Sequence, residues 1–170
     1  IKRRSHETYI LSKTMRIRLA KKADIWLLYN WVNKIDSIKN KLLTNRKISK
    51  IDHKIWYEIS LKNKNRYIWI IENKNIAIGQ LRFDINKDEK LCFIDIYIDK
   101  EHRKNNFGQK AINQAIDFIS QKYTLDYIIA LVLKTNIKSL NFFYSLGFVK
   151  YYDLNTYYEL RLNIEKNNEK

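Results

Sequence analysis

Residues 94–111 carry the pattern with the clearest chemical meaning. An alternating apolar run from Ile94 to Ile98 leads into a polar turn, Arg103–Gly108, and then into a helical pattern from about Phe107 to Gln121. Such a turn directs consecutive backbone N–H groups inward, and the helix dipole adds positive potential. The segment therefore predicts an anion site suited to a pyrophosphate, although an ordinary helix start has the same outline.

A second segment, Asn136–Phe148, follows a predicted strand at Tyr127–Leu133. Its apolar spacing predicts a helix from Ile137 to Leu146 that ends before Gly147. An amphipathic helix with a glycine cap explains this periodicity. It does not explain the leading asparagine or the distance from the first segment.

Together, the two segments resemble the two signatures of the GNAT superfamily of acetyltransferases. The first resembles the pyrophosphate loop, Arg/Gln-x-x-Gly-x-Gly/Ala: Arg103 and Gly108 match its ends, and Asn106 replaces its first glycine. Asparagine tolerates the left-handed backbone region well, so the turn can be kept. The second resembles Asn-x-x-Ala/Ser-x-x-Leu/Phe-Tyr-x-x-x-Gly-Phe, with matches at Asn136, Ser139, Phe142, Gly147 and Phe148. The resemblance covers about Met15 to Ile164.

The resemblance implies an α/β fold: a mixed, mostly antiparallel sheet with helices on both faces and splayed central strands. It also implies direct transfer of an acetyl group from acetyl-CoA to a primary amine in a ternary complex. Backbone N–H groups of Ile96–Ile98 would polarise the thioester carbonyl. The residues implied in cosubstrate binding are Ile96, Tyr97, Ile98, Arg103, Lys104, Asn105, Asn106, Phe107, Gly108, Gln109, Lys110, Asn136, Ser139 and Phe143.

The acid–base residues depart from the family pattern at Phe143, where the family usually has the tyrosine that protonates the departing CoA thiolate. Tyr144 is the next residue, but one step along a helix turns a side chain by about 100°, so Tyr144 is a weak candidate acid. The acceptor ammonium must lose a proton. His53 is the predicted base, directly or through water, because histidine titrates near neutral pH. A surface helix position would explain His53 equally well.

Three further stretches, beginning at Leu28, Ile48 and Gly79, resemble one branch of the superfamily. That branch acetylates nucleotide-linked aminosugars in pseudaminic-acid and related nonulosonic-acid biosynthesis; Val32 stands where its members usually have arginine. The resemblance implies acceptor-binding roles for Trp31, Asn33, His53, Trp56, Arg82 and Asp84. Core packing would also explain the tryptophans, and a solvated ion pair would explain Arg82 and Asp84. Ribosomal-protein or peptide N-terminal acetyltransferases share the Trp-bearing first helix and stay an alternative.

The rest of the pattern predicts the elements that hold these segments. Arg16–Ala20 alternates as a strand, and Asp24 can cap the first helix. A polar, lysine-rich loop is predicted from Asn33 to Lys50. Ser49 or Asp52 then begins a helix with an apolar face formed by Ile51, Ile55, Trp56 and Ile59. The complete order, β-α-α-β-β-β-α-β-α-β-β, predicts a mixed sheet with helices on both faces.

The length of 170 residues fits one domain, predicted at 15–164. Residues 1–14 are expected to be a linker, a tag or an upstream remnant, and 165–170 a polar tail. The single cysteine, Cys92, excludes an internal disulfide framework and suits a reducing compartment. The three histidines and Cys92 lack metal-ligand spacing, so no metal is expected. No apolar run is long enough to span a bilayer, and a cytoplasmic protein without a membrane partner is predicted.

The formal net charge is +15. This charge is compatible with a polyanionic partner, but the lysines are spread along the whole chain, and residues with AT-rich codons are abundant throughout. Compositional bias together with an anionic small ligand is favoured over a nucleic-acid surface. A small-molecule amine acceptor, a nucleotide-linked sugar, is the predicted partner; a homodimer or a fusion to an upstream domain stays open. The rival class is a non-catalytic basic module that binds CoA or nucleic acid, which Phe143 would favour.

Overall fold

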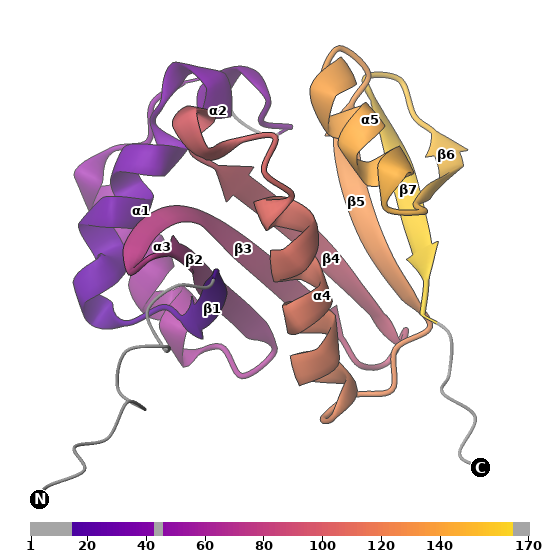
Figure 1. The fold of residues 1–170 in the computed structure, drawn as a ribbon, viewed down its shortest axis with the longest axis horizontal. Coiled ribbons are helices and arrows are strands. Elements are labelled where there is room, and N and C mark those ends of the chain that lie inside the picture. Colours follow the sequence, from indigo (N-terminus) through magenta and orange to yellow (C-terminus); the bar gives the residue numbers. More distant parts are fainter. Residues whose placement is uncertain (1–14, 43–45, 165–170) are drawn as a thin grey trace, which may run out of the picture.

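A computed structural model describes residues 15–42 and 46–164 of the chain; the predicted terminal segments lie outside these residues. Its centre is a seven-stranded sheet in the order β1-β2-β3-β4-β5-β7-β6 (Figure 1). Every neighbouring pair is antiparallel except β4 and β5, which are parallel. The predicted mixed, mostly antiparallel sheet is confirmed. The strands are β1 (Arg16–Leu19), β2 (Arg66–Asn73), β3 (Ile76–Asn86), β4 (Leu91–Ile98), β5 (Tyr127–Leu133), β6 (Val149–Asp153) and β7 (Tyr157–Asn163).

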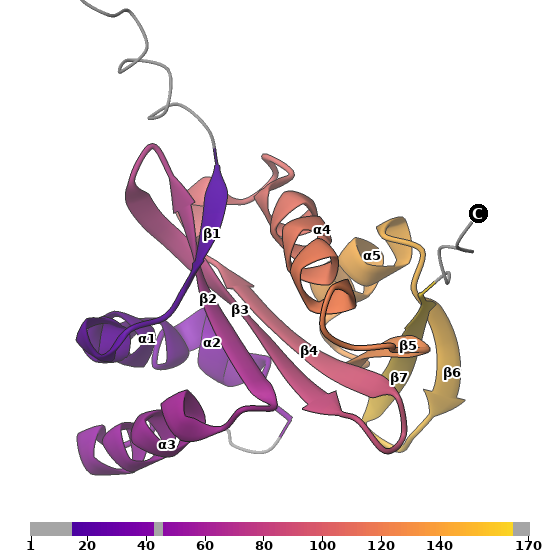
Figure 2. The same ribbon diagram turned by 90° about the horizontal axis from the view of Figure 1, so that it is seen from below.

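Helices cover both faces of the sheet, as predicted (Figure 2). On one face, α1, α2 and α3 lie against the β1–β4 side, and on the other face α4 and α5 lie beside the middle of the sheet. The helices are α1 (Ile25–Val32), α2 (Ile35–Lys39), α3 (Lys50–Lys62), α4 (Phe107–Ser120) and α5 (Ile137–Ser145), with short 3₁₀ turns η2 (Lys22–Asp24) and η3 (Lys100–His102). Two hydrophobic cores result, a large one under α4 and α5 and a smaller one under α1 and α3.

Helix α2 interrupts the segment that was predicted to be a loop from Asn33 to Lys50. Its five residues carry few apolar groups, and none is buried. Two ion pairs attach it to the segment that follows β4: Lys34 binds Asp99, and Asp36 binds Arg103. Because these contacts are long-range, local sequence pattern did not indicate the helix.

The packed face of α3 also differs from the prediction. Ser49 caps the helix by accepting a hydrogen bond from the Asp52 N–H at 3.0 Å, as expected. The isoleucines of the predicted apolar face, Ile51, Ile55 and Ile59, are instead 54–72% exposed. The buried residues of α3 are His53, which contacts α1, Tyr57, which lies in the smaller core, and Ser60, which accepts a hydrogen bond from Arg66.

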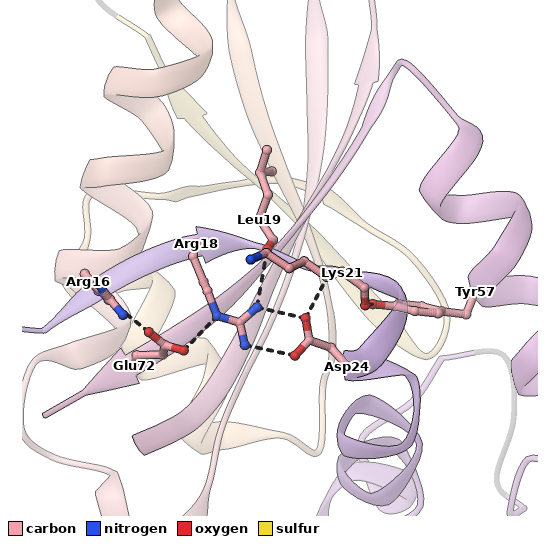
Figure 3. Close-up of polar contacts among 7 residues, drawn as sticks. All are labelled: Arg16, Arg18, Leu19, Lys21, Asp24, Tyr57 and Glu72. Atoms are coloured by element: carbon pink, nitrogen blue, oxygen red, sulfur yellow. Dashed lines mark hydrogen bonds and ion pairs between the residues drawn. The ribbon is translucent and has the colours of Figure 1, made fainter. Parts of the chain in front are cut away.

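A charged network fixes the start of α1 to the sheet (Figure 3). The guanidinium of Arg18 donates to both carboxylate oxygens of Asp24 at 2.8 and 2.9 Å and to Glu72 at 2.7 Å. Tyr57 joins from α3 by donating to the Lys21 carbonyl at 2.7 Å. Asp24 and Glu72 are both buried. Buried carboxylates are stable only when paired in this way, so the network fixes α1 and α3 relative to β1 and β2.

Candidate active site

Strands β4 and β5 pair over only a short stretch before they separate. Their register runs from Leu91 opposite Tyr127 to Phe93 opposite Ile129, whereas β3 stays paired with β4 as far as Ile98. Figure 1 shows the two strands diverging toward the ends where α2 and α5 lie. We call the part of the sheet beyond Phe93, where β4 has lost β5, the split. It is the predicted splay of the central strands.

Two backbone donors of β4 face this split. The N–H of Asp99 donates to the Ile78 carbonyl on β3 at 2.8 Å. Since N–H groups alternate in direction along a strand, the N–H of Tyr97 also faces β3, and those of Ile96 and Ile98 face the split. Donors in this arrangement can polarise a carbonyl placed between the strands. Ile96 and Ile98 are two of the three residues predicted for this role.

The turn before α4 has the backbone of an anion site. Asn106 adopts the left-handed conformation, with φ 57° and ψ 14°, which is the property expected of the residue that replaces a glycine. Lys104 is also left-handed, with φ 67°. The Lys110 N–H makes the first hydrogen bond of the helix, to the Asn106 carbonyl at 3.1 Å. The N–H groups of residues 107–109 therefore have no acceptor within the helix. These donors and the helix dipole can bind a phosphate group.

Gly108 has a packing role that its place in the motif did not indicate. A Cβ atom there would lie 2.9 Å from Cζ of Phe142 on α5. The missing side chain therefore lets the start of α4 approach α5 closely. The contact holds the anion turn against the helix that flanks the split.

Helix α5 contains the remaining predicted cosubstrate residues. The Asn136 side chain caps it by accepting from the Ser139 N–H at 3.2 Å. Phe143 is buried and packs edge-on against Phe148, with ring centroids 5.0 Å apart. Tyr144, one step further, is 42% exposed. Phe143 is thus a core residue with no proton to give, and the Tyr144 side chain leaves the helix in another direction.

His53 does not have the surroundings of the predicted base. It is only 2% exposed and lies 5.4–6.0 Å, between ring centroids, from Tyr29, Trp56 and Tyr57. Its Nε2 is 2.9 Å from the Ile25 carbonyl, which can only accept, so Nε2 carries the proton. Burial lowers the pKa of the imidazole. The ring joins α3 to the first residue of α1, and the geometry does not support proton abstraction from an acceptor.

Asn33 is also engaged within the chain. Its amide Nδ2 donates to the Ile48 carbonyl at 3.1 Å, and its Oδ1 accepts from the Ile48 N–H at 2.8 Å. Through these two hydrogen bonds the Asn33 side chain, just after α1, holds the backbone of Ile48, just before α3. Each polar atom of the amide makes one hydrogen bond to Ile48, which fixes the orientation of the side chain.

The other predicted acceptor residues meet on the face of the sheet that carries α3. Arg82 pairs with Asp84 at 3.1 Å, and Arg66 binds the same carboxylate. Both guanidinium groups lie beside the Trp56 ring, with their carbons 5.8 and 5.9 Å from its centroid. We call the side of β3 and β4 that holds these groups the acceptor face. Arg82 and Asp84 thus lie on one side of β3 and form the ion pair that was the alternative to an acceptor-binding role.

Three residues of this face were missed from the sequence. Arg66 starts β2, Asp95 lies 4.0 Å from Arg82 on β4, and Lys41 follows α2. Among the described residues, the Lys41 ammonium is buried without a hydrogen-bond partner. Burial lowers the pKa of Lys41, and the charge of Asp95 partly offsets this effect. The two-residue alternation of Phe93, Asp95 and Tyr97 could have indicated Asp95, whereas nothing local identifies Lys41.

Comparison with known proteins assigns the family. The family model for the acetyltransferase (GNAT) family matches residues 28–148, which is more than half of the chain. The chain therefore belongs to the acetyltransferase (GNAT) family, and it is an acetyl-CoA-dependent N-acetyltransferase. No curated protein sequence matches the chain significantly. A non-catalytic module was the rival interpretation, and membership of an enzyme family does not favour it.

Solved structures share this fold at low sequence identity. Spermidine N-acetyltransferase from Vibrio cholerae, in complex with CoA and spermine, has a TM-score of 0.74 at 19% identity, over 88% of this chain and 94% of that chain. An aminoglycoside acetyltransferase in complex with coenzyme A has a TM-score of 0.75 at 14% identity, over 88% and 95%. A ribosomal L7/L12 alpha-N-protein acetyltransferase has a TM-score of 0.73 at 14% identity, over 90% and 92%. Because their named acceptors differ in kind, this likeness does not select an acceptor.

Two further findings concern the described part of the chain. Within residues 15–42 and 46–164, no three His, Cys, Asp or Glu side chains are grouped so that they could hold a metal ion. None of the helices in those ranges is both long and apolar enough to cross a bilayer. Acetyl-CoA is the cosubstrate that the family and the geometry of the split accommodate.

Proposed function

We propose that the protein transfers the acetyl group of acetyl-CoA to the primary amine of a nucleotide-linked deoxyaminosugar. The observation that carries this proposal is the acceptor face itself. Two guanidinium groups lie beside Trp56 and the Asp84 carboxylate, and a buried ammonium lies near the Asp95 carboxylate, on strands that border the split where acetyl transfer is expected. The resemblance of three sequence stretches to aminosugar acetyltransferases supports the same class of acceptor.

In this proposal the cosubstrate occupies the split from the side of α4 and α5. Its pyrophosphate binds the N–H groups of residues 107–109 ahead of the helical bonds of α4. The thioester carbonyl meets the N–H groups of Ile96 and Ile98. Holding the thioester on fixed donors stabilises the oxyanion that forms when the amine attacks.

The charge of the acceptor face favours an anionic acceptor. Arg66, Arg82 and Lys41 are cationic, and both carboxylates, Asp84 and Asp95, already have Arg82 as a neighbour. A polycation would have to displace these arginines to reach a carboxylate. A diphosphate would instead gain charge-assisted hydrogen bonds from them.

The length of the acceptor face suits an extended acceptor. An open surface cavity of about 390 Å³ is lined by Asn65, Asp84, Asn86, Lys87, Asp88 and Phe93 among others. Phe93 lies four residues before Tyr97 on β4, a separation of about 13 Å at about 3.3 Å per residue. A sugar amine at Tyr97 would leave the nucleotide end of the molecule near this cavity.

Asp95 replaces His53 as the proposed base. Its side chain is half exposed and lies on the acceptor face two residues before Tyr97. A carboxylate there can accept the ammonium proton through a water molecule. The departing thiolate needs no enzyme acid, because a thiol with a pKa of about 8.5 leaves tolerably as the anion.

Cosubstrate binding is tested with Asn106→Asp. Aspartate tolerates the left-handed conformation and suits the start of a helix, so folding is retained. The added negative charge opposes a pyrophosphate, and titration calorimetry should show acetyl-CoA affinity reduced at least about tenfold, or about 1.4 kcal/mol. Asn113→Asp, an exposed position further along α4, adds the same charge as a control and should bind as wild type. Equal binding by all three proteins would exclude the turn as the pyrophosphate site.

The acceptor is tested by following CoA release with a UDP-4-amino sugar, an N-terminal peptide of a ribosomal protein, and spermidine. The proposal expects the sugar nucleotide to have the highest kcat/KM. Asp95→Asn should lower kcat for it by about a hundredfold, the lower end of what a general base contributes. A kcat/KM that is higher for the peptide or for spermidine would refute the sugar nucleotide as the acceptor.

A further inference from the structure

The Arg103 side chain lies on a different side of β4 from the one its place in the motif predicts. Its Nε donates to the Ile98 carbonyl at 2.8 Å, and its guanidinium carbon lies 5.6 Å from the centroid of the Tyr97 ring. The Tyr97 ring packs toward the smaller core under α1 and α3 and lies 6.0 Å from Trp31. The guanidinium is therefore directed to the acceptor side, away from the face where α4 begins.

Helix α2 receives this side chain. Asp36 accepts a hydrogen bond from Nη2 of Arg103, and two residues earlier Lys34 donates to both carboxylate oxygens of Asp99 at 2.8 Å. The two pairs have opposite polarity and connect the start of α2 to the two ends of η3. Asp99 also accepts from the Tyr97 hydroxyl at 3.5 Å. We call these two ion pairs the α2 clasp.

The segments on either side of α2 contribute to the acceptor face. Trp31 lies near the end of α1, just before α2, and contacts the Tyr97 ring. Lys41 follows α2, and its buried ammonium interacts electrostatically with Asp95. A shift of α2 would therefore move Lys41 and would change the surroundings of the Tyr97 ring, which Trp31 contacts from α1. Nothing in the clasp touches the N–H groups of residues 107–109 that are suited to the pyrophosphate.

We propose that Arg103 and Asp36 are positioning residues for the acceptor, which hold α2 and its flanking residues in place, and that the Arg103 side chain is not a ligand of the cosubstrate pyrophosphate. The backbone of the turn keeps its anion-binding role. The proposal rests on the proposed function only in that an amine acceptor binds beside Tyr97. In this proposal the turn between β4 and α4 serves both substrates. The Arg103 side chain supports the acceptor side, and the N–H groups of residues 107–109 bind the cosubstrate pyrophosphate.

The expected effects are modest because the pair is partly exposed, with 37% of the Arg103 and 35% of the Asp36 side chain accessible. Such a pair changes an equilibrium by at most about fivefold. The variants Asp36→Asn and Arg103→Gln keep side-chain size and remove one charge each. Their combination forms a double-mutant cycle, in which the double variant should be no worse than either single variant. Lys39→Ala, at the exposed end of α2, is the matched control.

Three measurements test the proposal. In both single variants, amide hydrogen exchange over residues 34–40 should speed up by about two- to fivefold, while acetyl-CoA affinity stays within about twofold of wild type. With an amine acceptor, its KM should rise by a similar factor at unchanged kcat. Acetyl-CoA affinity lowered more than about tenfold by Arg103→Gln, with unchanged exchange in α2, would overturn the proposal. The exchange and affinity measurements need no acceptor, so they distinguish the two roles of Arg103 even if the proposed acceptor is wrong.

Discussion

Replacing His53 by glutamine separates its structural role from the base role that its residue type first indicated. Glutamine can place its amide nitrogen near the position of Nε2 and keep the bond to the Ile25 carbonyl, which is 2.9 Å long in the wild type. It has no basic nitrogen. A general base contributes about 100- to 10,000-fold to the rate, so a catalytic His53 would show at least a hundredfold loss in kcat. We expect kcat within about threefold of wild type, a loss far smaller than the hundredfold that removal of a general base would cause.

His53→Ala supplies the contrasting perturbation. It removes the hydrogen bond and a ring that lies among Tyr29, Trp56 and Tyr57 at 2% exposure. Truncation of a buried aromatic residue together with loss of one hydrogen bond costs about 2–4 kcal/mol. The unfolding temperature should fall by about 5–15 °C, while His53→Gln loses much less.

Thermal unfolding and CoA-release kinetics on the two variants form the assay. Burial lowers the pKa of His53, so below about pH 6.5 the unfolded chain takes up a proton that the folded chain resists. The free energy of unfolding contributed by the neutral ring is complete above that pH and decreases as the pH falls. His53→Gln should remove this part of the slope. A hundredfold loss of kcat in a glutamine variant that unfolds at the wild-type temperature would refute the reasoning and restore His53 as the base.

The other predictions concern single contacts of the fold and the site. Gly79→Ala should lower the free energy of unfolding in denaturant by about 2–4 kcal/mol, because its Cβ would lie 2.2 Å from the Tyr97 carbonyl oxygen; a change below about 1 kcal/mol would contradict that contact. Hydrogen bonds from arginine hold the pKa of Asp24 below its usual value, and at Glu72 they outweigh the opposite effect of burial. The contribution of these two carboxylates to the free energy of unfolding should therefore be complete above about pH 4.5 and decrease as the pH falls further, as measured by denaturant titration across that range. Tyr144→Phe should keep activity within about tenfold, and a thousandfold loss in a folded variant would make Tyr144 the acid.

Local chemistry was sufficient to predict the parts of the fold that depend on neighbours in sequence. The alternating strands, the helix that begins at Phe107, and the left-handed Asn106 each follow from residue type and spacing. The parallel pairing of β4 with β5 follows from the helix that connects them, because a crossover of this length joins parallel strands. The split could be expected only through the resemblance to the family.

Long-range contacts decided what the sequence could not predict. Helix α2 exists where Lys34 and Asp36 meet partners more than sixty residues away. On α3 the isoleucine spacing predicted a packed face, yet the ring of His53 is buried because the Ile25 carbonyl provides its partner. Isoleucine is abundant throughout this chain, so its spacing on α3 carries less information than usual.

The split gives β4 the properties of an edge strand in the middle of a sheet. An ordinary sheet edge offers unpaired backbone groups to any passing chain, and proteins have to protect it against aggregation. Here the unpaired edge of β4 begins beyond three residue pairs with β5, where the two strands diverge (Figure 1). Beyond Phe93, β4 keeps its pairing with β3 as far as Ile98 but has no pairing with β5. The same lack of a neighbouring strand that is a liability at an ordinary sheet edge thus leaves the backbone groups of β4 open to a ligand.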